Sequence, residues 1–135
     1  MCLTIYDVPV VKKSETDMEF YKVLAVKDDG KYYSPYMNKE AELGVLHQDQ
    51  DLENFMIAKY SFWLEVTHGG FHLFKDEYYA RCEADYLNQV ITEGSDVKEY
   101  VVVKAIVPEG TTYVEGTYLA ETESVVVKKV RYKEI

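Results

Sequence analysis

One segment in the second half of the chain has the hydrophobic spacing of an amphipathic helix. The apolar positions of KDEYYARCEADYLNQVITEG (75–94) recur at intervals of four, three and four residues, at Ala80, Ala84, Leu87 and Ile91. Acidic residues stand in its first turn and Gly94 follows its last, as is typical of helix ends. The spacing therefore predicts one principal α-helix over about 76–92, with an apolar face that a sheet must cover.

The segments around this helix have the patterns of strands. EYVVVKAIVP (99–108) is apolar on both faces, which indicates a central strand that ends at Pro108. Earlier, EFYKVLAV (19–26) and KYYSPY (31–36) flank an Asp-Gly turn, which predicts a β-hairpin. Further strands are predicted at LGVLH (43–47), KYSFWLEVT (59–67), FHLF (71–74) and SVVVKKVRY (124–132), the last expected to be half-buried. The predicted fold class is α+β, a mostly antiparallel curved β-sheet packed by one principal α-helix.

The composition is that of one folded domain. The chain has 135 residues, of which 47% are hydrophobic, so 1–135 is treated as a single domain. No apolar run approaches the ~20 residues that cross a bilayer, and the N-terminus lacks the basic start of a signal peptide. Cys2 and Cys82 form no CxxC pair, which argues against a disulfide scaffold or a zinc site. These features predict a cytoplasmic protein without a membrane contact.

The acidic residues are concentrated in the middle of the chain. The net charge is −9, and residues 28–99 carry 15 acids against 6 bases. Such a segment repels a phosphate backbone, which excludes ordinary nucleic-acid binding, and attracts a basic host protein. The segment QDQDLEN (48–54) reads as an exposed acidic loop, so Asp49, Asp51 and Glu53 are the predicted partner-binding residues. The alternative is that these acids only keep the domain soluble.

Tyrosine is the most conspicuous residue type, with 13 in the chain. A tyrosine offers a rigid apolar ring with a polar tip, a combination that is enriched where a surface binds a ligand or a protein. The clusters predict a site for a small nucleotide-like ligand, made by Tyr32, Tyr33, Tyr36, His72, Tyr78 and Tyr79. Two alternatives stay open: the tyrosines serve half-buried strands, or the exposed ones form a homodimer interface.

Two further groups of residues offer possible chemical sites. His68 and His72 are four residues apart, but Gly69 and Gly70 between them disfavour a helix, and a third metal ligand is not evident. If Met1 is removed, Cys2 becomes an N-terminal thiol with its own amine as a base, although it also fits the role of a small hydrophobe. We therefore predict no catalytic residues, no metal and no cofactor.

Several short motifs resemble those of a widespread class of small uncharacterised proteins from gut anaerobes and their phages. The motifs are MCLTI at the start, YKVL (21–24), SPY (34–36), LG (43–44), GFHLF (70–74), VVKAIVPEGTTYVEG (102–116) and VVVKKVRY (125–132). The resemblance covers most of the chain. It implies a phage or mobile-element origin and no activity, because none is assigned to that class.

The order of elements is also similar to the layout of ADP-ribosyltransferase-like proteins. That resemblance would have His72 or Tyr21 hold a nicotinamide dinucleotide, and Glu121 or Glu123 polarise the acceptor. The Ser-Thr-Ser type of strand motif is missing here, so the resemblance covers the layout without the catalytic residues, and a fold does not carry function with it.

These observations predict a non-catalytic binding protein. In its sharper form it is a phage or mobile-element accessory or anti-defence factor that binds a nucleotide-like ligand or a basic host protein. The alternatives from other classes are a divergent ADP-ribosyl-type or N-terminal-cysteine enzyme, and a structural or assembly protein that acts as a homodimer.

Overall fold

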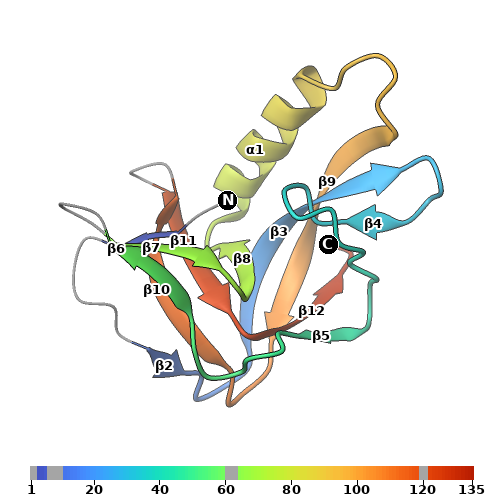
Figure 1. Ribbon diagram of the computed structural model, residues 1–135. Coiled ribbons are helices and arrows are strands. Elements are labelled where there is room, and N and C mark those ends of the chain that lie inside the picture. The colour runs from blue at the N-terminus through green and yellow to red at the C-terminus, as the bar shows by residue number, and fades with distance from the viewer. Residues whose placement is uncertain (1–2, 6–10, 60–63, 119–121) are drawn as a thin grey trace.

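The computed structural model describes residues 3–5, 11–59, 64–118 and 122–135, in which a mostly antiparallel β-sheet is combined with one α-helix (Figure 1). The helix is α1 (Glu77–Gln89). The strands are β1 (Leu3–Ile5), β2 (Lys12–Lys13), β3 (Met18–Lys27), β4 (Tyr32–Tyr33), β5 (Leu46–Gln48), β6 (Met56–Lys59), β7 (Leu64–His68), β8 (Phe71–Phe74), β9 (Val97–Val107), β10 (Thr112–Tyr118), β11 (Thr122–Val127) and β12 (Lys129–Lys133). The predicted α+β class is confirmed at this level.

The strands are hydrogen-bonded in the order β5-β12-β9-β3-β8-β11-β10-β1-β7-β6, with β2 beside β10 and β4 beside β3. Strands β11 and β12 follow one another in the chain, with only Lys128 between them. The hydrogen-bonded series of five strands, β12, β9, β3, β8 and β11, therefore begins and ends on the same segment of the chain. The longest pairing joins β3 to β9 and runs from Met18 opposite Val107 to Lys27 opposite Val97.

The main core lies between these five strands. Its buried residues are Leu24, Ala41, Leu73, Val103, Ala105, Val107, Val125, Val127, Val130 and Tyr132. Strand β9 gives its other face to the helix, where Tyr100 and Val102 pack with Ala80 and Ala84. The strand predicted at 99–108 is present and places apolar side chains on both faces, but among the described residues it has strands on both edges only from Lys104 to Ile106.

Helix α1 is shorter than predicted. Asp76 caps its first turn by accepting the N–H of Tyr78 at 2.8 Å. The helix ends at Gln89 with Val90 as its C-terminal cap, so Ile91, which was predicted to lie on the apolar face, is outside the helix. The run Val90-Ile91-Thr92 is β-branched, and such residues lose side-chain freedom in a helix, which favours an early end.

Three strand predictions need correction. The strand predicted at 43–47 is instead β5 (Leu46–Gln48), because Leu43 and Gly44 form a turn in which Gly44 has a φ of 81°. Residues 59–67 are not one strand, because β6 ends at Lys59 and pairs with β7 from Leu64 onward, while 60–63 lie outside the described residues. The segment 124–132 is interrupted at Lys128 and is more than half-buried, since 124–128 are all buried. The hairpin between 19–26 and 31–36 is confirmed, although only Ala25 and Val26 of β3 pair with β4.

Candidate functional site

Six large apolar side chains are exposed on α1 and on the turn that follows β4. We call this set the aromatic surface; its residues are Tyr36, Met37, Tyr78, Tyr79, Tyr86 and Val90, each at least 41% exposed. On the helix, Tyr79, Tyr86 and Val90 are spaced by seven and four residues and so share one side. This side is turned away from Ala80 and Ala84, which face the sheet.

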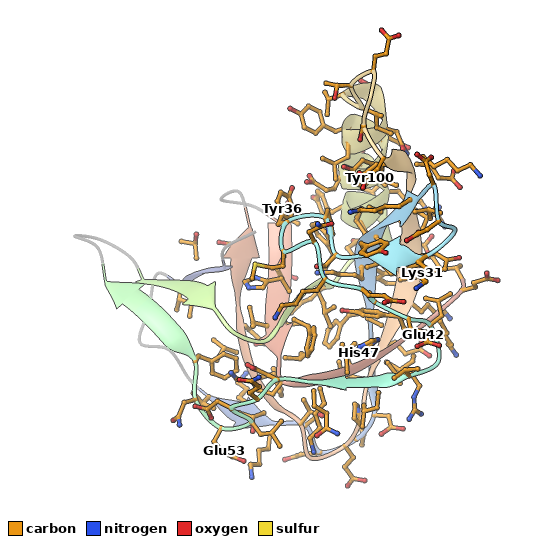
Figure 2. All side chains as sticks on the ribbon, turned by 45° about the vertical axis from the view of Figure 1, so that its right-hand side comes forward. Lys31, Tyr36, Glu42, His47, Glu53 and Tyr100 are labelled. Atoms are coloured by element: carbon orange, nitrogen blue, oxygen red, sulfur yellow. The ribbon has the colours of Figure 1, made fainter. Side chains whose placement is uncertain are left out.

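A hydrogen bond joins the turn to the helix. The hydroxyl of Tyr36, which is labelled in Figure 2, donates to Oε1 of Glu83 at 2.7 Å, so the turn after β4 contacts the helix at Glu83. The turn is held by its own backbone, because Asn38 N–H donates to the Ser34 carbonyl at 3.0 Å, with Asn38 at a φ of 53°. The Lys27 ammonium group also binds Oδ1 of Asn38.

The rings at the start of the helix contact one another. Tyr78 and Tyr79 meet edge to face with their centroids 5.4 Å apart. A hydrogen bond with Cys82, one turn later, raises the pKa of the Tyr78 hydroxyl. Cys82 is an exposed free thiol. These contacts order the two rings, and both residues stay exposed.

The border of the aromatic surface is acidic. Arg81 donates to Glu77 at 3.0 Å and so neutralises one carboxylate of the helix. Glu83 and Asp85 have no basic side chain within 4.0 Å among the described residues. The helix therefore presents tyrosine rings next to carboxylates whose charge is not balanced inside the fold.

Three of the six residues predicted to bind a ligand, Tyr36, Tyr78 and Tyr79, are exposed; Tyr78 contacts Tyr79, and Tyr36 binds Glu83 of the same helix. Tyr32 is half-buried against the main core. Tyr33 donates to Oδ2 of Asp29 at 2.6 Å, and this bond raises the pKa of Tyr33 to about 12. Its ring also lies 4.4 Å from the Lys27 ammonium group.

The sixth predicted ligand residue, His72, has its ring within the fold. Burial, together with the nearby charge of Lys22, lowers the pKa of His72 to about 3, and its buried Nδ1 atom has no hydrogen-bond partner among the described residues. Lys22 donates to the His72 carbonyl oxygen at 2.9 Å. Burial lowers the pKa of Lys22 to about 8. The sequence pattern gave no sign of Lys22, because one lysine in an apolar strand reads as an exposed position.

The acids predicted to bind a partner also make contacts within the molecule, and Asp51 and Glu53 are exposed. Asp49 accepts a hydrogen bond from Lys128 at 2.7 Å, and the Lys128 side chain is only 2% exposed. Asp51 accepts the backbone N–H groups of Glu53 and Asn54 at 3.1 and 3.0 Å. Glu53 lies 3.8 Å from the ammonium group of Lys13, at the far end of the molecule from Tyr36 (Figure 2).

Two shallow depressions mark the described surface. One, of about 300 Å³, is lined by Arg81, Ala84, Asp85, Asn88, Tyr100, Val101 and Val102. The other, of about 470 Å³, is lined by Lys12, Lys13, Glu15, Thr16, Met18 and Tyr113. None of the six predicted ligand residues lines either depression.

Of the residues considered as catalytic candidates, the structure describes only some. Cys2 and Glu121 lie outside the described residues, and Glu123 is an exposed residue of β11 opposite Thr117. Within the described part of the chain, no group of three His, Cys, Asp or Glu side chains is arranged to hold a metal ion. The helix that is described is too short and too polar to cross a membrane.

No protein-family model, curated protein or solved structure matches this chain. The resemblance to small proteins of gut anaerobes and phages, and the resemblance to the ADP-ribosyltransferase-like layout, therefore stay predictions.

Proposed function

We propose that the protein is a non-catalytic binding protein that docks a basic partner protein on the aromatic surface of α1 and the turn after β4. The observation that supports this is the joint exposure of six large apolar side chains, linked across two elements by the bond between Tyr36 and Glu83. Contiguous apolar patches with a polar border mark interaction sites on soluble proteins. Tyrosine and methionine are enriched in such interfaces.

The charge around the surface favours a basic partner. Glu83 and Asp85 stand on the same helix as the exposed tyrosines, and the chain carries a net charge of −9. Carboxylates of this kind attract a basic surface and raise its association rate. They also make a second copy of this chain a poor occupant, because two identical acidic helices repel each other. The proposal therefore differs from the homodimer interpretation.

The other predicted functions have less support. A nucleotide-like ligand would need the six predicted residues around one cavity, and the described depressions are lined by other side chains. An ADP-ribosyl-type enzyme would depend on Glu121 or Glu123, and an N-terminal-cysteine enzyme on Cys2. Glu123 is an exposed strand residue, and Cys2 and Glu121 lie outside the described residues. An accessory or anti-defence role in a phage agrees with protein binding and remains a prediction.

Paired variants test the proposal. Tyr78→Ala with Tyr86→Ala removes two exposed rings of the aromatic surface, and Val11→Ala with Val45→Ala removes two exposed apolar side chains elsewhere. Proteins retained from a host lysate by the wild type are identified, purified and titrated against all three forms. We expect the tyrosine variant to bind about tenfold or more weakly, and the valine variant to bind as the wild type does.

A second test removes one carboxylate and measures association at two ionic strengths. Asp85→Asn should slow association at low ionic strength and have little effect at high ionic strength, because exposed charges are screened there. Equal binding of the wild type and the tyrosine variant would reject the proposal, as would the absence of any protein that the wild type retains and the tyrosine variant does not. Loss of binding only in Asp51→Asn with Glu53→Gln would move the interface to the 48–54 segment.

A further inference from the structure

One edge of β9 lacks a strand neighbour over half of its length. Strand β3 covers β9 from Val97 to Val107 on one side. On the other side β12 covers only Lys104, Ala105 and Ile106. Among the described residues, no strand pairs with this second edge between 97 and 103. An open edge presents backbone N–H and C=O groups that can pair with another extended chain.

A side chain of the helix occupies part of this edge. The Asn88 amide donates to the Tyr100 carbonyl at 3.0 Å, and Asn88 Oδ1 accepts the Tyr100 N–H at 2.7 Å. The amide thus makes the two bonds that a neighbouring strand would make in a hydrogen-bonded antiparallel pair. Because Tyr100 directs its backbone groups to this side, Val102 does so as well, since alternate residues of a strand are equivalent.

The depression of about 300 Å³ is lined by residues of both α1 and β9, so it lies between the helix and the open edge. Ala84, Val101 and Val102 contribute its apolar lining. Asp85 contributes a carboxylate without a basic partner among the described residues, while the neighbouring Arg81 is held by Glu77. An extended backbone, a small apolar floor and one unbalanced carboxylate are thus found together.

We propose that the β9 edge at Tyr100 and Val102 is a second binding site, which takes an extended peptide segment of a partner protein as an added antiparallel strand. Val102 supplies two backbone bonds, and displacement of the Asn88 amide supplies the two of Tyr100. The peptide residue opposite Val102 shares its face of the sheet. That face is covered by α1 and carries Asp85, so this residue is a lysine or an arginine. The site contains none of the six residues of the aromatic surface, although it shares Asp85 with the acidic border of that surface.

The test uses a blocked peptide, Thr-Val-Lys-Val-Thr, titrated into the isotopically labelled protein while backbone amide signals are followed. We expect saturable shifts of the Tyr100 and Val102 amides with a dissociation constant of about millimolar. A peptide with N-methylated backbone amides should not bind, and replacement of its lysine by glutamate should weaken binding. Asp85→Asn should reduce the preference for lysine, and Tyr78→Ala should leave the titration unchanged.

Asn88→Ala distinguishes two roles of the β9 edge. The edge either binds a peptide, or Asn88 only protects it from pairing with another strand. If Asn88 competes with the peptide, its removal should tighten peptide binding by at least about threefold, as expected when a competing state is removed. Equal shifts with the N-methylated peptide, shifts confined to β5 or β6, or no saturable shift in the wild type would overturn the proposal. Dimerisation of Asn88→Ala in sedimentation, without peptide binding, would assign the edge to a second copy and also overturn it. If Asn88→Ala does not fold, the peptide titrations of the wild-type protein still test the proposal.

Discussion

The Nζ atom of Lys128 donates a 2.7 Å hydrogen bond to Oδ2 of Asp49, and the same oxygen accepts the Gly70 N–H at 2.7 Å. Lys128 is the residue that separates β11 from β12, and its ammonium group lies 4.3 Å from the centre of the Phe55 ring. The Asp49 carboxylate, in the loop after β5, therefore binds both Lys128, between β11 and β12, and the turn between β7 and β8.

Asp49→Asn is expected to destabilise the fold by about 3 kcal/mol. Removal of one partner leaves the Lys128 charge buried without a counter-charge, which is the costly way to break a buried pair. Asp28→Asn removes the same charge from an exposed position and is the matched control. Denaturant unfolding measures both variants. A difference between them below about 0.5 kcal/mol would show that the pair does not contribute to stability.

The ion pair between Asp49 and Lys128 also predicts that the stability of the fold depends on pH in the acidic range. Burial by itself raises the pKa of Asp49, but the hydrogen bonds from Lys128 and Gly70 outweigh it and hold the pKa below its ordinary value. A depressed carboxyl pKa contributes stability above the unfolded pKa of about 3.9, and this contribution is lost as the pH falls toward the lower folded pKa. The stability gap between wild type and Asp49→Asn should therefore be full at pH 6 and shrink below about pH 4. A gap that stays constant down to about pH 2 would contradict this assignment.

Lys22→Met should be more stable than the wild type at neutral pH. In the fold, desolvation lowers the pKa of Lys22 to about 8, and its ammonium group binds one carbonyl oxygen. The unfolded chain keeps this proton up to about pH 10.4. Between these two values the unfolded state binds more protons, so wild-type stability gains from Lys22 as the pH rises. The advantage of Lys22→Met should thus decrease from about pH 8 to about pH 10.

Lys98→Met serves as the control for that series, because Lys98 is an exposed lysine of β9. It should show no comparable change with pH. Thermal unfolding of the three forms across the alkaline range measures the effect. An advantage of Lys22→Met that is independent of pH would show that the ammonium group stays charged throughout.

Local patterns in the sequence predicted the elements whose causes are local. The spacing of Ala80 and Ala84 predicted the helix and its buried face, and the same periodicity leaves Tyr78, Tyr79 and Tyr86 off that face. The Asp-Gly turn predicted the hairpin, and the apolar character of both faces predicted β9 as a central strand. Of the aromatic surface, Tyr36, Tyr78 and Tyr79 were named from the sequence, whereas Met37, Tyr86 and Val90 were not predicted as site residues.

What the sequence did not reveal depends on residues far apart along the chain. Lys128 is 79 residues from Asp49, and without that partner it reads as an ordinary exposed strand lysine. The pairing of β3 with β9 is equally non-local, as is the contact between Tyr36 and Glu83. Asn88 reads as a polar helix position, and only the arrangement of α1 beside β9 shows that its amide pairs with Tyr100.

Gly70→Ala is expected to lower the free energy of unfolding by about 2–4 kcal/mol. This loss combines the backbone strain of a positive φ with overpacking by the added Cβ. Gly70 has a φ of +72°, and an added Cβ would lie 2.6 Å from Cγ1 of Val126 and 2.9 Å from the carbonyl oxygen of Val127. Gly30 is the matched control, because its φ is +77° and an added Cβ would meet nothing within 4 Å. Gly30→Ala should therefore show only the backbone strain, about 1 kcal/mol. Chemical denaturation of both variants measures the difference, and equal losses would mean that the approach of Gly70 to β11 does not constrain the turn before β8.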